Sequence, residues 1–426
     1  MNDLIRRYAW VNASMAAMFG LAMPVVYLAL LEKGVSIAQF GLLVAAFTLS
    51  SVAFDIPFGA LADVIGRKRV FMLGEMTMFA ATAGIWLVSS LTGLCVVMAL
   101  SGLSRAMLSG TLDALMVDQM REESGGDLDS AEILAAQAKV GGLSALSLGG
   151  AAILGGFLPI WMDDLLHHPR WVGYYEINFA VMLPLIGIHL LLTASVIRDP
   201  GYARERLSGS TPERHGGWRK VEKAALAALR SPGMLPLFAI QLVSGAALEM
   251  VDAFWQPRLA TFIDAKSGSW LFGVLCSISF ITMGLGHKVS MHLGAMFRQR
   301  YARLLSVLQL SLGLAIILFA FQNEIYGFFV GYVLLYLIAG SMAAPMTTVV
   351  QQGAEDDMRS TLLSMKSVVQ QCGALAGVLA GAHVAQNYGI SVAWLSIGGV
   401  VIVSCLWFPV YTAMQAGRAA PINEAT

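Results

Sequence analysis

Five of the ionisable side chains inside long apolar stretches of this sequence are candidates for chemistry. They are Asp55, Arg105, Asp113, Glu249 and Asp252. Inside a bilayer such groups are costly to bury, and they mark proton or substrate pathways by default. We therefore expect them to bind protons reversibly or to recognise a charged solute.

Two of the five residues lie in one stretch, "SRAMLSGTLDALMVD". Arg105, Ser109 and Asp113 follow one another at intervals of four, which predicts a single helical face about 12 Å long. Arg105 lies near the middle of the stretch, where it would either contact an anionic solute or pair with a carboxylate inside the protein.

A pair of carboxylates lies in "LEMVDAFWQPR". Glu249 and Asp252 are three residues apart, on one helical face, so either can hold a proton near neutral pH beside the other. This pattern favours proton coupling or the recognition of cations. If the apolar stretch ends early, both carboxylates face water and have no special role. Asp55 precedes a proline, which can leave a backbone carbonyl free; it either titrates or bonds to a neighbouring helix.

The composition requires a membrane around these residues. The chain has 426 residues, of which 57% are hydrophobic and 13% are charged, whereas soluble domains carry charges at about a quarter of their positions. The 27 basic residues balance the 27 acidic ones, so nucleic acid is not an expected partner. The four cysteines have no paired spacing. We therefore expect no cofactor, metal site or disulfide framework.

The predicted fold class is an all-α polytopic membrane protein. Crossing the hydrocarbon core takes about 20 mostly apolar residues, and the sequence offers twelve such stretches. These are about 8–31, 38–62, 70–90, 93–118, 134–158, 173–197, 233–256, 268–291, 302–322, 325–350, 361–385 and 390–415.

Basic residues predict the orientation of these spans. Most Lys and Arg residues fall in the two tails and the even-numbered loops, which places both termini in the cytoplasm of a multi-pass plasma or inner-membrane protein. The longest polar segment then divides the chain into two halves. The predicted parts are a six-helix bundle over 1–197, a cytoplasmic linker over 198–232, a second six-helix bundle over 233–415 and a tail over 416–426.

The second part of the linker has an amphipathic pattern. Trp218, Val221, Ala225 and Leu229 fall on one helical face, with Lys and Arg opposite. We expect a short helix on the inner membrane surface; a solvated helix is the alternative.

A compact motif, "GALADVIGRKRV", follows the second span. Its Gly59 and Asp63 share a helical face with Asp55, and Gly59 predicts a close contact with another helix. The motif resembles the loop 2–3 signature of the major facilitator superfamily, G-x-L-a-D-r-x-G-R-k-x-x-l, which Gly59, Leu61, Asp63, Gly66, Arg67 and Lys68 match. The twelve spans and the central loop also resemble that family, which implies two six-helix halves.

The resemblance implies roles for several residues. In that family the motif is a cytoplasmic gate latch, in which Asp63 and Arg67 would share a charge network with Asp118. Such a network would stabilise one conformation and break in the other; the alternative is that these charges only set the topology. Arg105 resembles the family's fourth-span arginine, associated with proton coupling or substrate binding. The drug-efflux branch carries a fifth-span motif whose proline is missing here.

These observations favour a transporter. The sequence has no G-x-x-x-x-G-K-[ST] motif for an ATP-driven pump and no clustered catalytic set for an enzyme. We expect a monomeric secondary transporter that works by alternating access and exports amphipathic or cationic small molecules in exchange for protons. The alternative is uptake of an anionic metabolite or a siderophore-like chelator, with Arg105 as the anion contact. A second alternative is a membrane sensor, which would bind ligand without flux.

Overall fold

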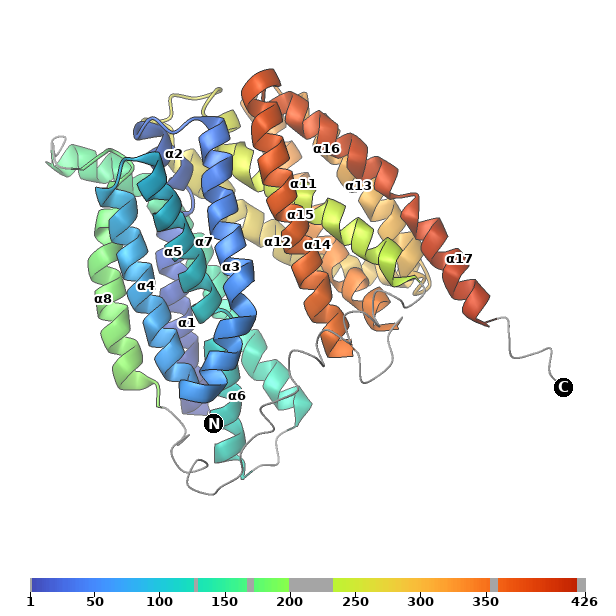
Figure 1. The fold of residues 1–426 in the computed structure, drawn as a ribbon, viewed down its shortest axis with the longest axis horizontal. Coiled ribbons are helices and arrows are strands. Elements are labelled where there is room, and N and C mark those ends of the chain that lie inside the picture. The colour runs from blue at the N-terminus through green and yellow to red at the C-terminus, as the bar shows by residue number, and fades with distance from the viewer. Residues whose placement is uncertain (1, 126–128, 167–171, 199–232, 353–358, 420–426) are drawn as a thin grey trace. The chain divides into compact units, whose positions relative to one another are not determined.

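The structure is a computed structural model that describes residues 2–125, 129–166, 172–198, 233–352 and 359–419 (Figure 1). The described residues form helices and no strand, and they include 12 helical stretches long and apolar enough to cross a membrane. The predicted all-α class and number of spans are confirmed. The linker, with its expected amphipathic helix at Trp218 to Leu229, lies outside the described residues.

The helices follow the apolar runs of the sequence, and several begin or end one to two turns beyond the predicted limits. Their bounds are α1 Asn2–Ala22, α2 Val26–Glu32, α3 Ile37–Ile65, α4 Arg67–Leu87, α5 Leu91–Leu108, α6 Thr111–Glu123, α7 Ser130–Leu166, α8 Ile177–Val196, α11 Met234–Leu259, α12 Ser269–Met296, α13 Tyr301–Ala320, α14 Ile325–Gln352, α15 Arg359–Tyr388, α16 Ile390–Ser404 and α17 Trp407–Ala419.

Three spans are built from two helices each. The first span is interrupted between α1 and α2, beside Pro24, and the last between α16 and α17. The fourth span is interrupted between α5 and α6, where Gly110 has φ +65° in the left-handed region. A residue in that region cannot continue a right-handed helix. The break at Gly110 matters for the site, because Arg105 and Asp113 lie on either side of it.

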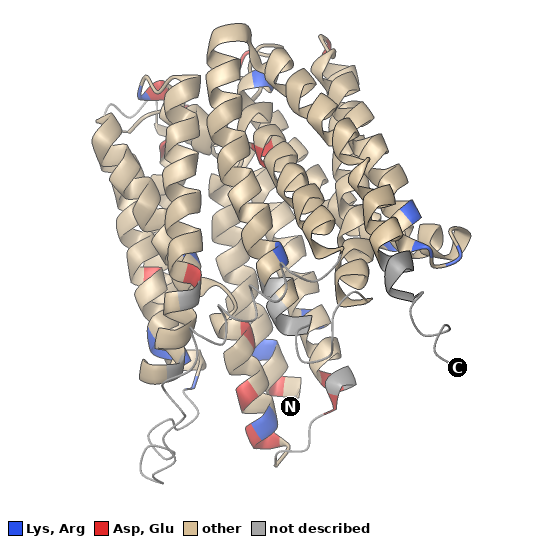
Figure 2. Cartoon of the chain, turned by 45° about the vertical axis from the view of Figure 1, so that its right-hand side comes forward, with Lys and Arg blue, Asp and Glu red and all other residues tan. Residues whose placement is uncertain are grey.

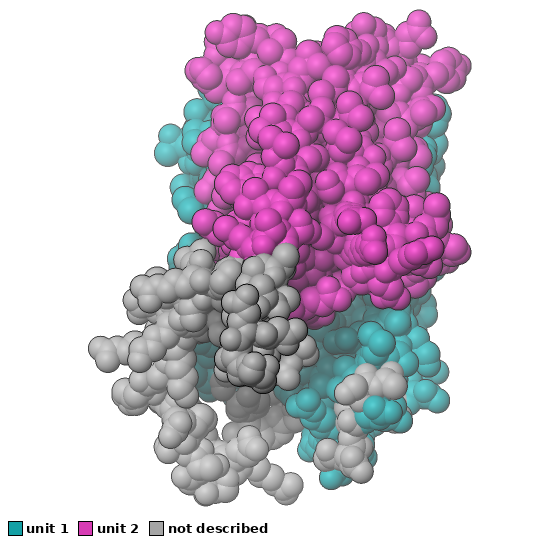
Figure 3. Space-filling view, turned by 90° about the vertical axis from the view of Figure 1, so that its right-hand side faces the viewer, with its two compact units in different colours: residues 1–211, 259–278 teal, residues 212–258, 279–426 magenta. Residues whose placement is uncertain are grey.

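The chain forms two compact units, coloured separately in Figure 3. The first contains residues 1–211 and 259–278, and the second contains residues 212–258 and 279–426. Charged residues lie mainly near the ends of the helices, with a few along their length (Figure 2). This distribution is the one that a hydrocarbon environment imposes, since an unpaired charge is costly at its centre.

In the first unit, α1 packs against α7 and α8, and α3 packs against α5. Small residues make these approaches possible. A Cβ at Gly155 of α7 would lie 2.5 Å from the carbonyl oxygen of Leu21, and one at Gly102 of α5 would lie 2.1 Å from that of Phe47. Helices that are driven together by packing in a bilayer approach closely at such residues.

In the second unit, a glycine stripe holds α15 against α11. A Cβ at Gly373 would lie 1.9 Å from the Leu242 carbonyl oxygen, and one at Gly377 would lie 2.5 Å from Ala246. Glycines at intervals of four, Gly373, Gly377 and Gly381, thus allow α15 to pack closely against α11. This contact fixes α11, the helix that carries Glu249 and Asp252.

Candidate functional site

An ion pair joins the start of α4 to α6. The guanidinium of Arg67 donates a hydrogen bond of 2.8 Å to the carboxylate of Asp118, and the side chains are 22% and 30% exposed. The structure thus brings together the two residues that the resemblance paired. A half-buried pair like this one is less screened by solvent than a surface pair, so it can help hold α6 against α4.

The turn that presents Arg67 depends on the residues on either side of it. Gly66 ends α3 and precedes α4 with φ +103° and ψ 135°, a conformation that a side chain would strain. Lys68 donates hydrogen bonds of 2.8 and 2.6 Å to the carbonyl oxygens of Ala194 and Ile197. A cation there satisfies free carbonyls and complements the dipole at the end of α8.

The other two residues of the motif are placed differently from the expectation. A Cβ on Gly59 would meet no atom within 4 Å in the described chain, so the close helix contact that we predicted at Gly59 is not found; this glycine faces open space. Asp63 lies near the C-terminal end of α3, and its side chain is outside what the structure describes.

Arg105 lies on α5 and reaches toward α3. Its guanidinium donates a hydrogen bond of 3.2 Å to the Ser51 hydroxyl and lies 5.9 Å from the ring centre of Phe47. The side chain is exposed and forms no ion pair with any described carboxylate. Since its contacts are neutral, its charge is available to an anionic group.

The predicted continuous face of Arg105, Ser109 and Asp113 is wrong. α5 ends at Leu108, Ser109 has an extended backbone, and Gly110 is left-handed before α6 begins. Asp113 is exposed in the first turn of α6, where its carboxylate is favourable to the helix dipole. The sequence spacing assumed an unbroken helix, and the Ser-Gly step breaks it.

Asp55 lies on α3, two residues before Pro57. Its side chain is exposed and forms no hydrogen bond to a described residue. The internal hydrogen bond that we considered for Asp55 is therefore not found in the described chain, and its role in titration stays a prediction.

Asp252 lies beside a set of aromatic rings in the second unit. Its carboxylate accepts a hydrogen bond from the Tyr336 hydroxyl of α14. The Tyr336 ring lies 4.7 Å from that of Tyr332, which lies 5.3 Å from that of Trp255. Glu249 lies one turn earlier on α11 and is half-buried. A carboxylate next to aromatic rings has the chemistry that binds an organic cation.

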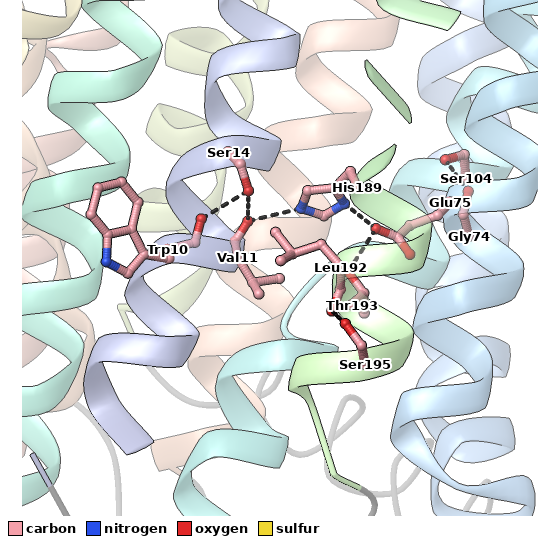
Figure 4. Close-up of polar contacts among 10 residues, drawn as sticks. All are labelled: Trp10, Val11, Ser14, Gly74, Glu75, Ser104, His189, Leu192, Thr193 and Ser195. Carbon is pink, nitrogen blue, oxygen red and sulfur yellow. Dashed lines mark hydrogen bonds and ion pairs between the residues drawn. The ribbon is translucent and has the colours of Figure 1, made fainter. Parts of the chain in front are cut away.

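The sequence reasoning missed Glu75, the one acidic residue of α4. Glu75 is 0% exposed, and its Oε1 contacts Nδ1 of His189 on α8 and accepts a hydrogen bond of 3.2 Å from the Thr193 hydroxyl (Figure 4). The other ring nitrogen, Nε2, lies 3.0 Å from the carbonyl oxygen of Val11 on α1. His189 was not among the predicted site residues, and its ring is the partner of the Glu75 carboxyl group. The isolated acid in "FMLGEMTMF" was the signal that could have found it.

A second buried ion pair lies at the ends of helices, and neither of its members was a predicted site residue. Lys33 contacts Glu176 at 2.5 Å, with side chains 5% and 13% exposed, and also donates to the Trp86 carbonyl oxygen at 3.1 Å. The neighbouring Tyr175 donates its amide to the Glu32 carboxylate at 3.1 Å. Burial raises the pKa of the Tyr175 phenol, so it stays neutral at physiological pH. Lys33 therefore joins the ends of α2, α4 and α8.

In the part of the chain that the structure describes, no three His, Cys, Asp or Glu side chains are grouped so that they could hold a metal ion.

Comparisons with known proteins identify the family to which this architecture belongs. The family model of the Major Facilitator Superfamily matches residues 9–364. The quinolone resistance protein NorA of Staphylococcus aureus (strain COL) is 23% identical over 399 residues, which cover 90% of this chain and 91% of NorA. An uncharacterized transporter of Buchnera aphidicola is 32% identical over 84 residues, and this chain spans only 21% of its length. The inner membrane transport protein YajR of Escherichia coli is 34% identical over 93 residues, 22% of this chain and 20% of YajR.

Solved structures share the fold. The nucleoside transporter NupG superposes with a TM-score of 0.77 at 14% identity, covering 97% of this chain and 99% of NupG. The POT family transporter PepTSo has a TM-score of 0.68 at 13% identity and covers 97% of each chain.

Proposed function

Because this chain belongs to the major facilitator superfamily, we propose that it exports amphipathic or cationic small molecules across the plasma membrane in exchange for protons. The observation that carries the proposal is the site around Asp252. There a carboxylate, a tyrosine hydroxyl and the tilted, neighbouring rings of Trp255, Tyr332 and Tyr336 gather on α11 and α14.

The chemistry of that site favours a cation with an aromatic body. The Asp252 carboxylate is exposed, so it is available to a cationic partner, and an aromatic ring beside it attracts both a positive charge and a flat apolar ring. Glu249 supplies a second carboxylate one turn away on α11. The likeness to NorA over nine-tenths of the chain supports export of a drug-like solute.

We propose that the other features follow the family pattern. Both termini would face the cytoplasm, the protein would act as a monomer, and the halves over 1–197 and 233–415 would alternate access to the substrate. The Arg67–Asp118 pair would be a latch that holds the cytoplasmic ends of α4 and α6 together in one conformation and releases them in the other.

A second candidate is favoured by one specific observation. Arg105 is an exposed cation on an embedded helix with only neutral contacts, Ser51 and Phe47. An arginine held in this way can bind a carboxylate or phosphate bidentately. The second candidate is therefore uptake of an anionic metabolite or chelator, with Arg105 as the anion contact.

Flux in proteoliposomes with an imposed pH gradient separates these candidates. We expect the native protein to move ethidium, an aromatic cation, against its gradient and to dissipate the pH gradient as it does so. Asp252→Asn should abolish this flux, because the amide removes the charge that holds the cation. Asp264→Asn, which removes an exposed acid bonded to Ser267, is the matched control and should transport normally.

The anionic arm of the assay uses calcein, a polyanionic chelator. Proton-driven calcein uptake that disappears in Arg105→Ala, with no ethidium flux, would replace the export proposal with the second candidate. Binding of either dye without flux would indicate the sensor alternative.

A further inference from the structure

We propose that Glu75 and His189 form a proton-binding site in the first unit, separate from the cation site at Asp252. This inference rests on the proposed proton coupling and names where the coupling proton is held. It stands on a buried acid–imidazole contact among α1, α4 and α8 (Figure 4).

The hydrogen-bond partners fix the number of protons on the pair. The Val11 carbonyl oxygen can only accept, so Nε2 of His189 carries a hydrogen and donates it. Oε1 of Glu75 accepts from the Thr193 hydroxyl and contacts Nδ1 of His189. A contact this close needs one proton between Nδ1 and Oε1, and the pair then has no net charge; we assign it as an imidazolium facing a carboxylate.

Losing that proton is strongly opposed while the helices are packed. A neutral imidazole would turn the Nδ1 lone pair toward the carboxylate, so two acceptors would face each other. A net negative charge would also remain where Glu75 is 0% and His189 3% exposed. A buried charge without a partner is among the most destabilising defects in a protein.

Gaining a second proton is opposed too. The remaining carboxylate oxygen, Oε2, is buried and has no hydrogen-bond partner among the described residues. A hydrogen on Oε2 would find no acceptor there, and the pair would become a buried cation. The packed state therefore holds one proton, and exchange of that proton requires the helices to separate.

The elements that surround the pair offer no competing group. α1 contributes the Tyr8 phenol one turn before Val11, and α5 contributes the Ser104 hydroxyl, which donates to the Gly74 carbonyl oxygen. Nearby charges are engaged elsewhere: Lys68 of α4 bonds to the end of α8, and the α6 carboxylate Asp118 is paired with Arg67. In the described chain, only Thr193 and the Val11 carbonyl bond to the pair besides its own members.

A purely structural role explains the pair less well. Apolar residues of similar volume would hold α4 and α8 together at least as well as a buried ion pair. The unsatisfied Oε2 adds a cost that packing alone does not explain. Thr193 lies three residues before the end of α8, so a small separation at that end would admit water to the carboxylate and let the proton leave.

The test compares Glu75→Gln and His189→Gln with the native protein in three measurements. The first is ethidium flux driven by a pH gradient, and the second is exchange of labelled for unlabelled ethidium without a gradient. The third is nitrogen-15 magnetic resonance of His189 in lipid nanodiscs from about pH 5 to about pH 9, across the usual range of a histidine. The amide of Glu75→Gln can still donate to Nδ1, so this variant keeps the packing and removes the proton.

We expect both variants to lose gradient-driven flux and to keep exchange, because exchange requires no net proton movement. We also expect the His189 signal of an imidazolium in the native protein and of a neutral imidazole in Glu75→Gln. Thr82→Val, at another buried polar residue of α4, is the control and should behave as the native protein in all three measurements.

Three results would overturn the inference: gradient-driven flux retained in Glu75→Gln, loss of both flux and exchange in that variant, or the same His189 signal with and without the carboxylate. The two ethidium assays on the native protein test the proposed function separately. If the native protein carries no ethidium in either assay, that proposal fails, and the His189 signal alone decides whether the pair holds a proton.

Discussion

Removing one member of the Lys33–Glu176 pair should destabilise the protein strongly. The two side chains are 5% and 13% exposed and lie 2.5 Å apart, so truncation of either leaves a nearly buried charge alone. Losing one partner of a buried pair costs about 3–5 kcal/mol. Each charge keeps one backbone contact, Lys33 with the Trp86 carbonyl and Glu176 with the Gly173 amide, so we expect about 3 kcal/mol for Lys33→Met and for Glu176→Gln.

The double variant separates the pair's interaction from the loss of each residue. Lys33→Met/Glu176→Gln leaves no unpaired charge, so it should cost about 2 kcal/mol less than the sum of the single variants. The measurement is the free energy of unfolding in detergent micelles by reversible denaturant titration. Tryptophan fluorescence is a suitable probe because Trp86 contacts Lys33 through its carbonyl.

The matched control is an ion pair of similar length that is open to solvent. Arg7 contacts Asp3 at 2.6 Å, with side chains 47% and 51% exposed. Arg7→Ala should leave the free energy of unfolding unchanged, because water and salt screen this pair. Strictly additive effects of Lys33→Met and Glu176→Gln, or single effects as small as that of Arg7→Ala, would refute the reasoning from burial.

Three further predictions use the same titration. Gly66→Ala should lower the free energy of unfolding by about 1–3 kcal/mol, because φ +103° strains any residue with a side chain; an unchanged value would contradict the backbone assignment. Asp118→Asn should cost about 1 kcal/mol, and the swap Arg67→Asp/Asp118→Arg should recover part of it if the pair acts through its charges. Gly377→Leu should separate α15 from α11, because even a Cβ would lie 2.5 Å from the α11 backbone, whereas Gly141→Ala meets no atom within 4 Å and should be neutral.

Most of the fold could be predicted from the sequence because a bilayer imposes a simple rule. Each span needs an apolar run of fixed length, and twelve such runs gave twelve spanning stretches. The helix interruptions were harder to predict. Glycine and serine, the residue types at positions 110 and 109, also occur inside unbroken membrane helices. Only the left-handed backbone conformation of Gly110 distinguishes this break from an ordinary helical glycine.

The candidate site likewise contains contacts that the sequence could predict and contacts that it could not. The pairing of Arg67 with Asp118 was predicted because the motif around Arg67 resembles the signature of a known family. The structure brings the two residues together. The contact of Glu75 with His189 joins residues 114 positions apart, on two helices with no motif between them. Which spans pack side by side decides such a contact, and apolar periodicity does not encode it. The same reason hid the Tyr336 partner of Asp252.

The two proposed sites also constrain how coupling would work. Glu75 and His189 belong to the first unit, and Asp252 with its aromatic neighbours belongs to the second. A proton and a cation that bind to different units do not compete for one carboxylate, so each must act on the other through the conformational equilibrium. Proton concentration would then change how fast ethidium is carried and leave its affinity for Asp252 unchanged within one conformation. The opposite result is direct competition, in which acid raises the apparent dissociation constant of ethidium equally in Glu75→Gln and in the native protein. That result would place the coupling proton on Asp252 or Glu249.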